Sequence, residues 1–358
     1  MHGLKHRSRL QRIANVLLLN ASFIDNLGLL NGKIGIAIFF YKYARYTDNK
    51  TYEDFAGDLI DEIYEEISTN TPVDFANGLT GIGWGIEYLI KNGFVEADAD
   101  KALAEIDNSV YQNSLYRPFL LDNSNDLFGY GFYFITRLQG QRNDDNNLTT
   151  LFKKQHLIYL TDDCERILIQ KQYLDFNIQS LSLETVNSFV WFLLNMHKLG
   201  LFPVKVEKLF HSLPEYIESA SQSSDDIHGL SLLLRLTEYI IPTIADKGLQ
   251  KILKTILIKK NGMVSNIECS DNVMIDNFIK NIWQQMVYEP YLTEVKQLQD
   301  TIGKIFLIIE DEENWNRRLD NLNKDNLGLT GFAGLGLGLL SGRMNKELRT
   351  TKVEVSTE

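Results

Sequence analysis

The sequence predicts an all-α protein in which amphipathic helices cover an inner set of helices that are apolar on nearly all sides. Residues 52–67 place an apolar side chain at every fourth position from Phe55 to Ile67, with acids between them, as in a surface helix. Residues 34–44 and 188–196 are instead apolar almost all round, which is typical of a helix inside a protein. Segments of these two kinds alternate along the chain, and the period-two alternation of strands is scarce. The pattern therefore indicates concentric layers of helices.

A glycine-containing motif that recurs along the chain supports the same fold class. Three copies are clear, NGKIGIAIF, NGLTGIGWGI and TGFAGLGLGL, and they begin at Asn31, Asn77 and Thr330. Gly32 and Gly78, in the first two copies, are 46 residues apart. A period of this length is typical of stacked helical repeats, each of which needs neighbours to bury its apolar face.

Weaker copies of the motif extend the repeat over the rest of the chain. DLFGYGF and IHGLSLLL are recognisable, and their spacing predicts two further copies near residues 180 and 280, where ETVNSFVW and DNFIKNIW stand. In the sixth copy Trp283 comes six residues after Asn277, which aligns Asn277 with Gly78. In the fifth copy we align Gly229 with the same glycine. The chain then contains seven copies.

The repeated glycines require a physical reason, because glycine inside a helix costs roughly 1 kcal/mol relative to alanine. A phosphate-binding loop needs a preceding strand and often a following lysine, but residues 71–77 are no convincing strand and no lysine follows. In a closed stack of helices, the N-terminal turns of the inner helices crowd together, and glycine lets their backbones approach. We therefore predict that these glycines serve packing and tight turns.

The glycine-bearing copies resemble those of lanthionine synthetase C-like proteins. The resemblance is carried by GLLNGKIGIAIFFYKYARYT, FANGLTGIGWGIEYLI and GLTGFAGLGLGLL, and it extends from Gly28 to Gly342. It implies an α/α toroid with about seven inner and seven outer helices, in one domain over residues 1–345 with a polar tail over 346–358. The cyclases of this family use zinc at the mouth of the toroid to add cysteine thiols to dehydrated Ser or Thr residues of a ribosomal peptide.

The resemblance also implies where zinc ligands would stand, namely a Cys-x-Gly in the fifth copy and a Cys-His-Gly in the sixth. In our register these positions hold Ile227, Ile275 and Asp276, and isoleucine cannot bind zinc. A different register places Cys269 and Ser270 at the Cys-His pair, which makes Cys269 a weak candidate ligand. We therefore expect no cofactor and no catalysis, whereas zinc is expected if the register is wrong.

His228 is the histidine that stands at a repeat turn, and it is the weak candidate for a catalytic residue. It has the chemistry of a general base, although a polar residue at a helix start also serves to satisfy backbone groups. The preceding Asp225 and Asp226 are expected to cap a helix. Cys164 is flanked by acids and is expected to be an unreactive helix residue.

A closed toroid would bring the polar residues of the helix starts together around one mouth, above tryptophans of the inner helices. Such an arrangement suits a peptide or another ligand, but the same side chains are also suited to capping helix ends. The candidate binding residues at the cavity mouth are Asn31, Asn77, Trp84, Asp126, His228, Asp276, Trp283 and Thr330.

Composition narrows the partners of the 358-residue chain. Its net charge of −11 disfavours nucleic acid and suits a basic peptide or protein. The two cysteines are far apart and form no CxxC motif, so we expect a cytoplasmic protein. The apolar stretch over 16–19 is too short for a signal peptide, and no stretch is long enough to span a membrane.

Three functions are consistent with these observations. The first is a non-catalytic lanthionine synthetase C-like protein that binds a peptide or a partner enzyme in ribosomal-peptide modification. The second is a zinc-dependent thioether cyclase. The third is a carbohydrate-active α/α toroid with paired carboxylates, for which Glu87, Glu184 and Asp276 are the candidates.

Overall fold

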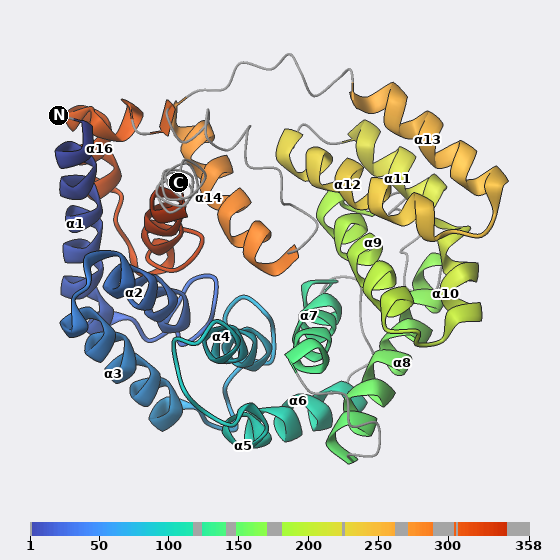
Figure 1. The fold of residues 1–358 in the computed structure, drawn as a ribbon, viewed down its shortest axis with the longest axis horizontal. Coiled ribbons are helices and arrows are strands. Elements are labelled where there is room, and N and C mark those ends of the chain that lie inside the picture. The colour runs from blue at the N-terminus through green and yellow to red at the C-terminus, as the bar shows by residue number, and fades with distance from the viewer. Residues whose placement is uncertain are drawn as a thin grey trace, which may run out of the picture.

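The protein is a ring of helices in two layers (Figure 1). The computed structural model describes residues 2–116, 124–140, 148–169, 181–223, 226–261, 271–288, 304–305 and 307–341. Within these ranges every regular element is a helix, so the predicted all-α toroid is confirmed. The predicted tail over 346–358 lies outside the described residues. No helix in the described part of the chain is long and apolar enough to cross a membrane.

The inner layer consists of the helices that the apolar segments predicted. Their burial extends all round the helix: in α9, Thr185 to Met196 are buried without interruption. In the described part of the chain these inner helices are α2 (Lys33–Thr47), α4 (Leu79–Lys91), α7 (Ser124–Gly140), α9 (Leu183–Lys198), α12 (Ile227–Ile240), α14 (Asp271–Tyr288) and a last helix over 332–341. All seven predicted copies of the motif, including those near 180 and 280, lie on these inner helices.

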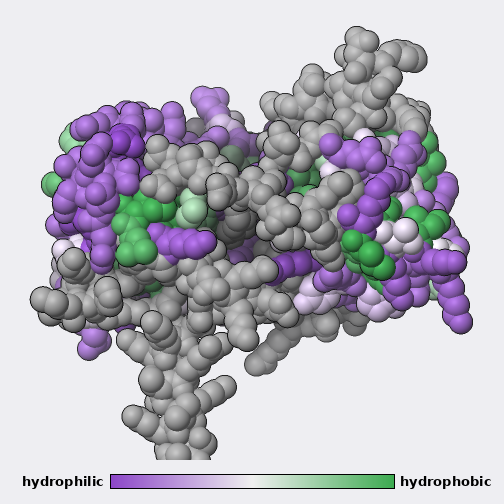
Figure 2. Space-filling model, turned by 90° about the horizontal axis from the view of Figure 1, so that it is seen from above, coloured by the Kyte–Doolittle hydropathy of each residue, from purple (hydrophilic) through white to green (hydrophobic). Residues whose placement is uncertain are grey.

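The outer helices are amphipathic. Of the seventeen residues of α3 only Ala56, Leu59 and Ile63 are buried, because acids occupy the rest of its surface. Seen from one edge, the described surface is mostly hydrophilic, with small separate hydrophobic patches (Figure 2). The outer helices are α1 (His2–Asn20), α3 (Lys50–Glu66), α5 (Ala99–Ala102), α6 (Ala104–Tyr116), α8 (Leu148–Leu168), α10 (Pro203–Phe210), α11 (Leu213–Ser223), α13 (Lys247–Asn261) and α16 (Glu312–Asp320), with short 3₁₀ turns η1 (Ala21–Phe23), η3 (Ile241–Thr243) and η4 (Lys324–Asn326).

The turns before the inner helices close the ring through backbone hydrogen bonds. The amide of Thr330 donates to the carbonyl of Leu30 at 2.9 Å, and the amide of Leu30 donates to the carbonyl of Ala76 at 2.8 Å. The last, first and second copies are therefore neighbours in space, although the first and the last are 300 residues apart. These are the three copies in which the motif is clearest. Their turns touch one another, and glycine is needed where the backbones come close.

Glycine is required where these turns meet. A Cβ at Gly28 would lie 2.2 Å from the Cα of Asn77, and one at Gly328 would lie 2.4 Å from the carbonyl oxygen of Leu30. Both neighbours are backbone atoms, which have no alternative position to take. The glycines therefore serve close approach of the backbone, as predicted.

The outer layer is joined next to this closure by a contact between α1 and α16. Arg9 pairs with Glu312 at 3.0 Å, and its guanidinium lies 5.4 Å from the ring centroid of the buried Trp315. Arg12 bonds Glu312 and also lies over Trp315. The two ends of the chain therefore meet in both layers.

The predicted register of the fifth and sixth copies is wrong. The N-cap of α12 is Asp226, so Gly229 stands at the third helical position and does not correspond to the N-cap Gly78. In the sixth copy α14 begins at Asp271, so Asn277 lies in the middle of a helix. The physical reason is that the Asp226 side chain accepts a hydrogen bond from the Gly229 amide, so this helix start needs no glycine at its N-cap.

Replacing Gly28 by alanine is expected to destabilise the fold by about 1–3 kcal/mol or more, because the added Cβ overlaps the backbone of Asn77. Urea unfolding followed by circular dichroism measures this change. The matched control is Gly57→Ala in the outer helix α3, where the nearest atom to a new Cβ is 3.8 Å away. That variant is expected to gain about 0.5–1 kcal/mol. Equal effects of the two substitutions would contradict the packing role of Gly28.

Candidate functional site

Three predicted mouth residues lie together where the turns meet. Asn31 Nδ2 donates to Asn77 Oδ1 at 2.9 Å, and Thr330 Oγ1 donates to Asn31 Oδ1 at 2.6 Å. Asn26 Nδ2 also donates to Asn77 Oδ1, at 2.7 Å. These side chains cap no helix, because the N-caps here are Gly32 and Gly78. They instead connect neighbouring turns, and a binding role for them stays a prediction.

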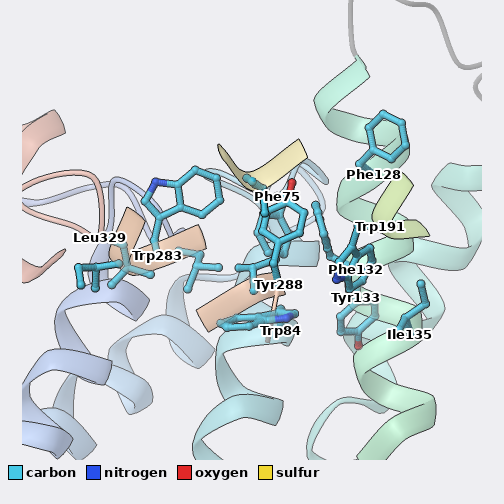
Figure 3. Close-up of a cluster of buried hydrophobic side chains, with 14 of the residues drawn as sticks. Phe75, Trp84, Phe128, Phe132, Tyr133, Ile135, Trp191, Trp283, Tyr288 and Leu329 are labelled. Carbon is cyan, nitrogen blue, oxygen red and sulfur yellow. The ribbon is translucent and has the colours of Figure 1, made fainter. Parts of the chain in front are cut away.

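The predicted tryptophans belong to an aromatic cluster in the centre of the ring (Figure 3). Trp84 of α4 lies edge-on to Phe75, with ring centroids 6.0 Å apart, and Phe75 lies 5.2 Å from Phe132 of α7. Phe132 is also 4.4 Å from Trp191 of α9 and 5.3 Å from Tyr288 of α14. All five side chains are buried. The inner helices thus meet through aromatic rings.

The helix α14 crosses the central region. Its middle packs against the last helix, where a Cβ at Gly338 would lie 2.4 Å from the Phe278 ring. Its C-terminal residue Tyr288 reaches α7 and α9 on the other side of the ring. Trp283 lies between these two contacts and is buried. The side chains of α14 therefore join the last helix to α7 and α9.

The remaining polar candidates lie on or next to α7, α12 and α14. Asp126 and His228 are in the first turns of α7 and α12, and their side chains lie outside the described residues, as does all of Cys269. Asp226 caps α12, as expected, and also pairs with Lys280 of α14 at 2.8 Å. The amide of Asn187 on α9 donates to the carbonyl of Gly229, so α9 contacts the residue next to His228.

The three acids considered for carbohydrate chemistry have different surroundings. Glu87 is buried and pairs with Arg137 at 2.7 Å. Asp276 is exposed and pairs with Arg318 of α16 at 2.9 Å. Glu184, in the first turn of α9, is exposed. The described geometry therefore shows no pair of these carboxylates facing each other.

A buried ionic cluster between α4, α5, α6, α7 and α8 was not foreseen. Arg137 is 0% exposed and pairs with Glu87, Asp100 and Asp107 at 2.7–2.8 Å. Buried Lys153 pairs with Asp100 at 2.9 Å. Burial raises the pKa of Glu87 even though Arg137 opposes that shift. The available signal was a single charge in each of two apolar stretches, GIGWGIEYLI and FGYGFYFITRL.

A pocket next to this cluster lies between α6, α7 and α8. Its walls include Tyr111, Phe152, Lys153 and His156. The imidazole of His156 stacks on Tyr111 at 4.4 Å, and burial lowers the pKa of His156 to about 4. His156 is therefore a neutral core residue.

The described residues do not supply a zinc site. They contain no group of three or more His, Cys, Asp or Glu side chains placed to hold a metal ion. Ile275 is buried and has no donor atom, and Asp276 is engaged by Arg318. Cys164 is buried, and burial raises the pKa of its thiol, which disfavours the thiolate that zinc requires. Cys269 lies outside the described residues, so the alternative register that makes it a ligand stays a prediction.

Two concentric layers of helices, with glycine turns in backbone contact at one end, define an α/α toroid. The family model described as Lanthionine synthetase C-like protein matches residues 24–150, which include α2, α4 and α7. Over this segment the chain is similar to lanthionine synthetase C-like proteins, which supports the resemblance inferred from its glycine motifs. No curated protein matches the chain.

Arg137→Met is expected to lower the free energy of unfolding by about 3–5 kcal/mol, because it leaves buried carboxylates without their cation. Chemical denaturation at neutral pH measures this change. The control is Arg318→Met, whose partner Asp276 has 70% of its side chain exposed, and the expected loss there is at most about 1 kcal/mol. If Arg137→Met loses no more stability than Arg318→Met, the ionic cluster does not hold α4 to α7.

Acid is expected to destabilise the protein through His156. In the unfolded chain this histidine takes up a proton near its ordinary pKa of about 6.5, whereas in the folded protein it stays neutral down to about 4. Stability is therefore lost as the pH falls through this interval, by about 3 kcal/mol at pH 4. Thermal denaturation from pH 7 to 4 is expected to show a shallower decline for His156→Phe. His211→Phe, at a half-exposed site, should follow the wild type.

Proposed function

We propose that the protein is a non-catalytic lanthionine synthetase C-like protein that binds a peptide, or a partner enzyme, during modification of a ribosomal peptide. The observation that carries the proposal is the replacement of the zinc ligands in a retained toroid. The resemblance implies two cysteine ligands, whereas the two cysteines of the chain are Cys164, which is buried on the outer helix α8, and Cys269, so neither register supplies both ligands. The hydrogen bonds that close the ring are nevertheless present.

Charge supports a basic peptide or protein as the partner. The net charge of the chain is −11. The outer helix α3 contributes exposed acids along its length, among them Glu53, Asp58, Asp61 and Glu65. A surface of this sign speeds association with a basic partner. The scarcity of cysteine, together with the buried Cys164, supports a cytoplasmic location.

The cyclase remains the second candidate, because α14 begins just after Cys269. In the alternative register Cys269 aligns with a family cysteine and would supply one zinc ligand. One thiolate does not make a zinc site, which requires three protein ligands in a catalytic centre. The two proposals therefore differ in the metal content of the purified protein.

Untagged protein purified from zinc-supplemented cells is expected to contain well under one zinc per chain by inductively coupled plasma mass spectrometry. Chelation with EDTA is expected to leave its melting temperature unchanged, because no metal contributes to its stability. Cys269→Ser is the matched variant. One zinc per wild-type chain that is lost in Cys269→Ser would overturn the non-catalytic proposal in favour of the cyclase.

A further inference from the structure

The pocket between α6, α7 and α8 has the size of a small-molecule site, and the proposed function does not use it. It encloses a cavity of about 120 Å³. An apolar cavity of about 150 Å³ in another protein takes up benzene, so this space suits a single aromatic ring. Most of the described lining residues belong to the outer helices α6 and α8, which places the pocket in the outer layer of the toroid.

The walls of the pocket are aromatic from its mouth to its buried end. Phe152 is 52% exposed, and its ring centroid lies 5.7 Å from that of the half-buried Tyr111. Tyr111 stacks on the buried His156 at 4.4 Å, and Phe134 meets the same imidazole edge-on at 4.8 Å. Because His156 is neutral in the folded protein, none of these four rings carries a charge. Such walls favour another aromatic ring as the occupant.

Lys153 supplies the polar group at the buried end. Its side chain is 2% exposed and lines the pocket. An ammonium group has three N–H donors. Among the residues that the structure describes, Lys153 Nζ makes one hydrogen bond, to Asp100 at 2.9 Å, and the oxygen of Asp107 is 3.8 Å away, beyond hydrogen-bond distance. A buried cation with unused donors favours an occupant that carries an acceptor.

The ionic cluster behind the pocket selects a neutral acceptor. The cluster contains the cations Arg137 and Lys153 and the carboxyl groups Glu87, Asp100 and Asp107. These groups provide no excess of positive charge. A further carboxylate or phosphate would therefore be buried without a cation of its own, which costs free energy. A hydroxyl oxygen avoids that cost.

We propose that this pocket binds a small neutral aromatic compound of the phenol class. The ring of the compound packs against Tyr111 and Phe152 and covers the exposed part of Phe152. Its oxygen accepts a hydrogen bond from Lys153 Nζ. The site lies outside the inner ring and involves no metal, so it goes beyond the proposed function and does not depend on it.

The probe is 4-fluorophenol, whose binding to the full-length protein at neutral pH is measured by the broadening of its ¹⁹F NMR signal. Fluorobenzene has the same ring without the oxygen. It is expected to bind about tenfold more weakly, because it lacks the hydrogen bond to the ammonium group. The anion 4-fluorobenzoate is also expected to bind about tenfold more weakly than 4-fluorophenol, because the cluster offers it no free cation.

Phe152→Ala tests the wall of the pocket at a site where the fold tolerates the change, because the side chain is half exposed. Its affinity for 4-fluorophenol is expected to fall about tenfold. The matched control is Leu151→Ala, the neighbouring residue on α8, which is 48% exposed and is not among the described lining residues. Its affinity is expected to equal that of the wild type.

Lys153→Met tests the donor. This variant is expected to bind 4-fluorophenol and fluorobenzene equally well, since it retains the rings but lacks the ammonium group. If circular dichroism shows that the variant does not fold, the comparison of the two probes on wild-type protein tests the same hydrogen bond.

The assignment is overturned if wild-type protein leaves the 4-fluorophenol signal unchanged, or binds fluorobenzene or 4-fluorobenzoate as tightly. Equal affinities of Phe152→Ala and Leu151→Ala would overturn it as well. N-acetyltyrosinamide presents the phenol ring on a peptide unit. Tighter binding of this compound than of 4-fluorophenol would assign the pocket to a tyrosine side chain of a protein partner and overturn the small-molecule proposal. The metal content of the protein is independent of all these outcomes.

Discussion

The structure depends on one constraint, which is the direct backbone contact between the turns that precede three inner helices. The turn at Thr330 bonds the turn at Leu30, and Leu30 in turn bonds Ala76. Because these contacts involve main-chain atoms, a side chain at Gly28 or Gly328 has no room. The direction in which each inner helix leaves its turn is thereby fixed, and the outer helices have to follow the closed ring that results.

This constraint explains why the described starts of the inner helices differ around the ring. The first and second copies begin at Gly32 and Gly78 with no side-chain cap, and the backbone of the loop before each helix occupies the space where a Cβ would lie. In the fourth and fifth copies the N-caps are Ser182 and Asp226, whose side chains bond the amides of the first turn. The first backbone amides of a helix have no partner within the helix. In these two helices a side chain just before the helix accepts a hydrogen bond from one of them.

The same difference explains what the sequence could and could not predict. Apolar segments and glycine turns identified all the inner helices, because each of these signals lies within one helix and its turn. The register of the fifth and sixth copies was wrong because Asp226 replaces a glycine at the cap and α14 starts six residues before Asn277. The buried cluster was missed since Glu87 and Arg137 meet across two helices, 50 residues apart in the chain. The Asn31, Asn77 and Thr330 contacts were placed correctly at one mouth, but their mutual hydrogen bonds depend on side-chain geometry.

Side-chain contacts join α9, α12 and α14 in another part of the ring. Asn187 is bonded to Gly229 in the turn region of α12, and Trp191 contacts Tyr288 at the end of α14. The fifth and sixth copies, in which the resemblance would place zinc ligands, belong to this same part of the ring. Asp226 caps the start of α12 and also pairs with Lys280 of α14. The ring is thus held by backbone contacts between the turns of the first, second and last copies, and by side-chain contacts among α9, α12 and α14.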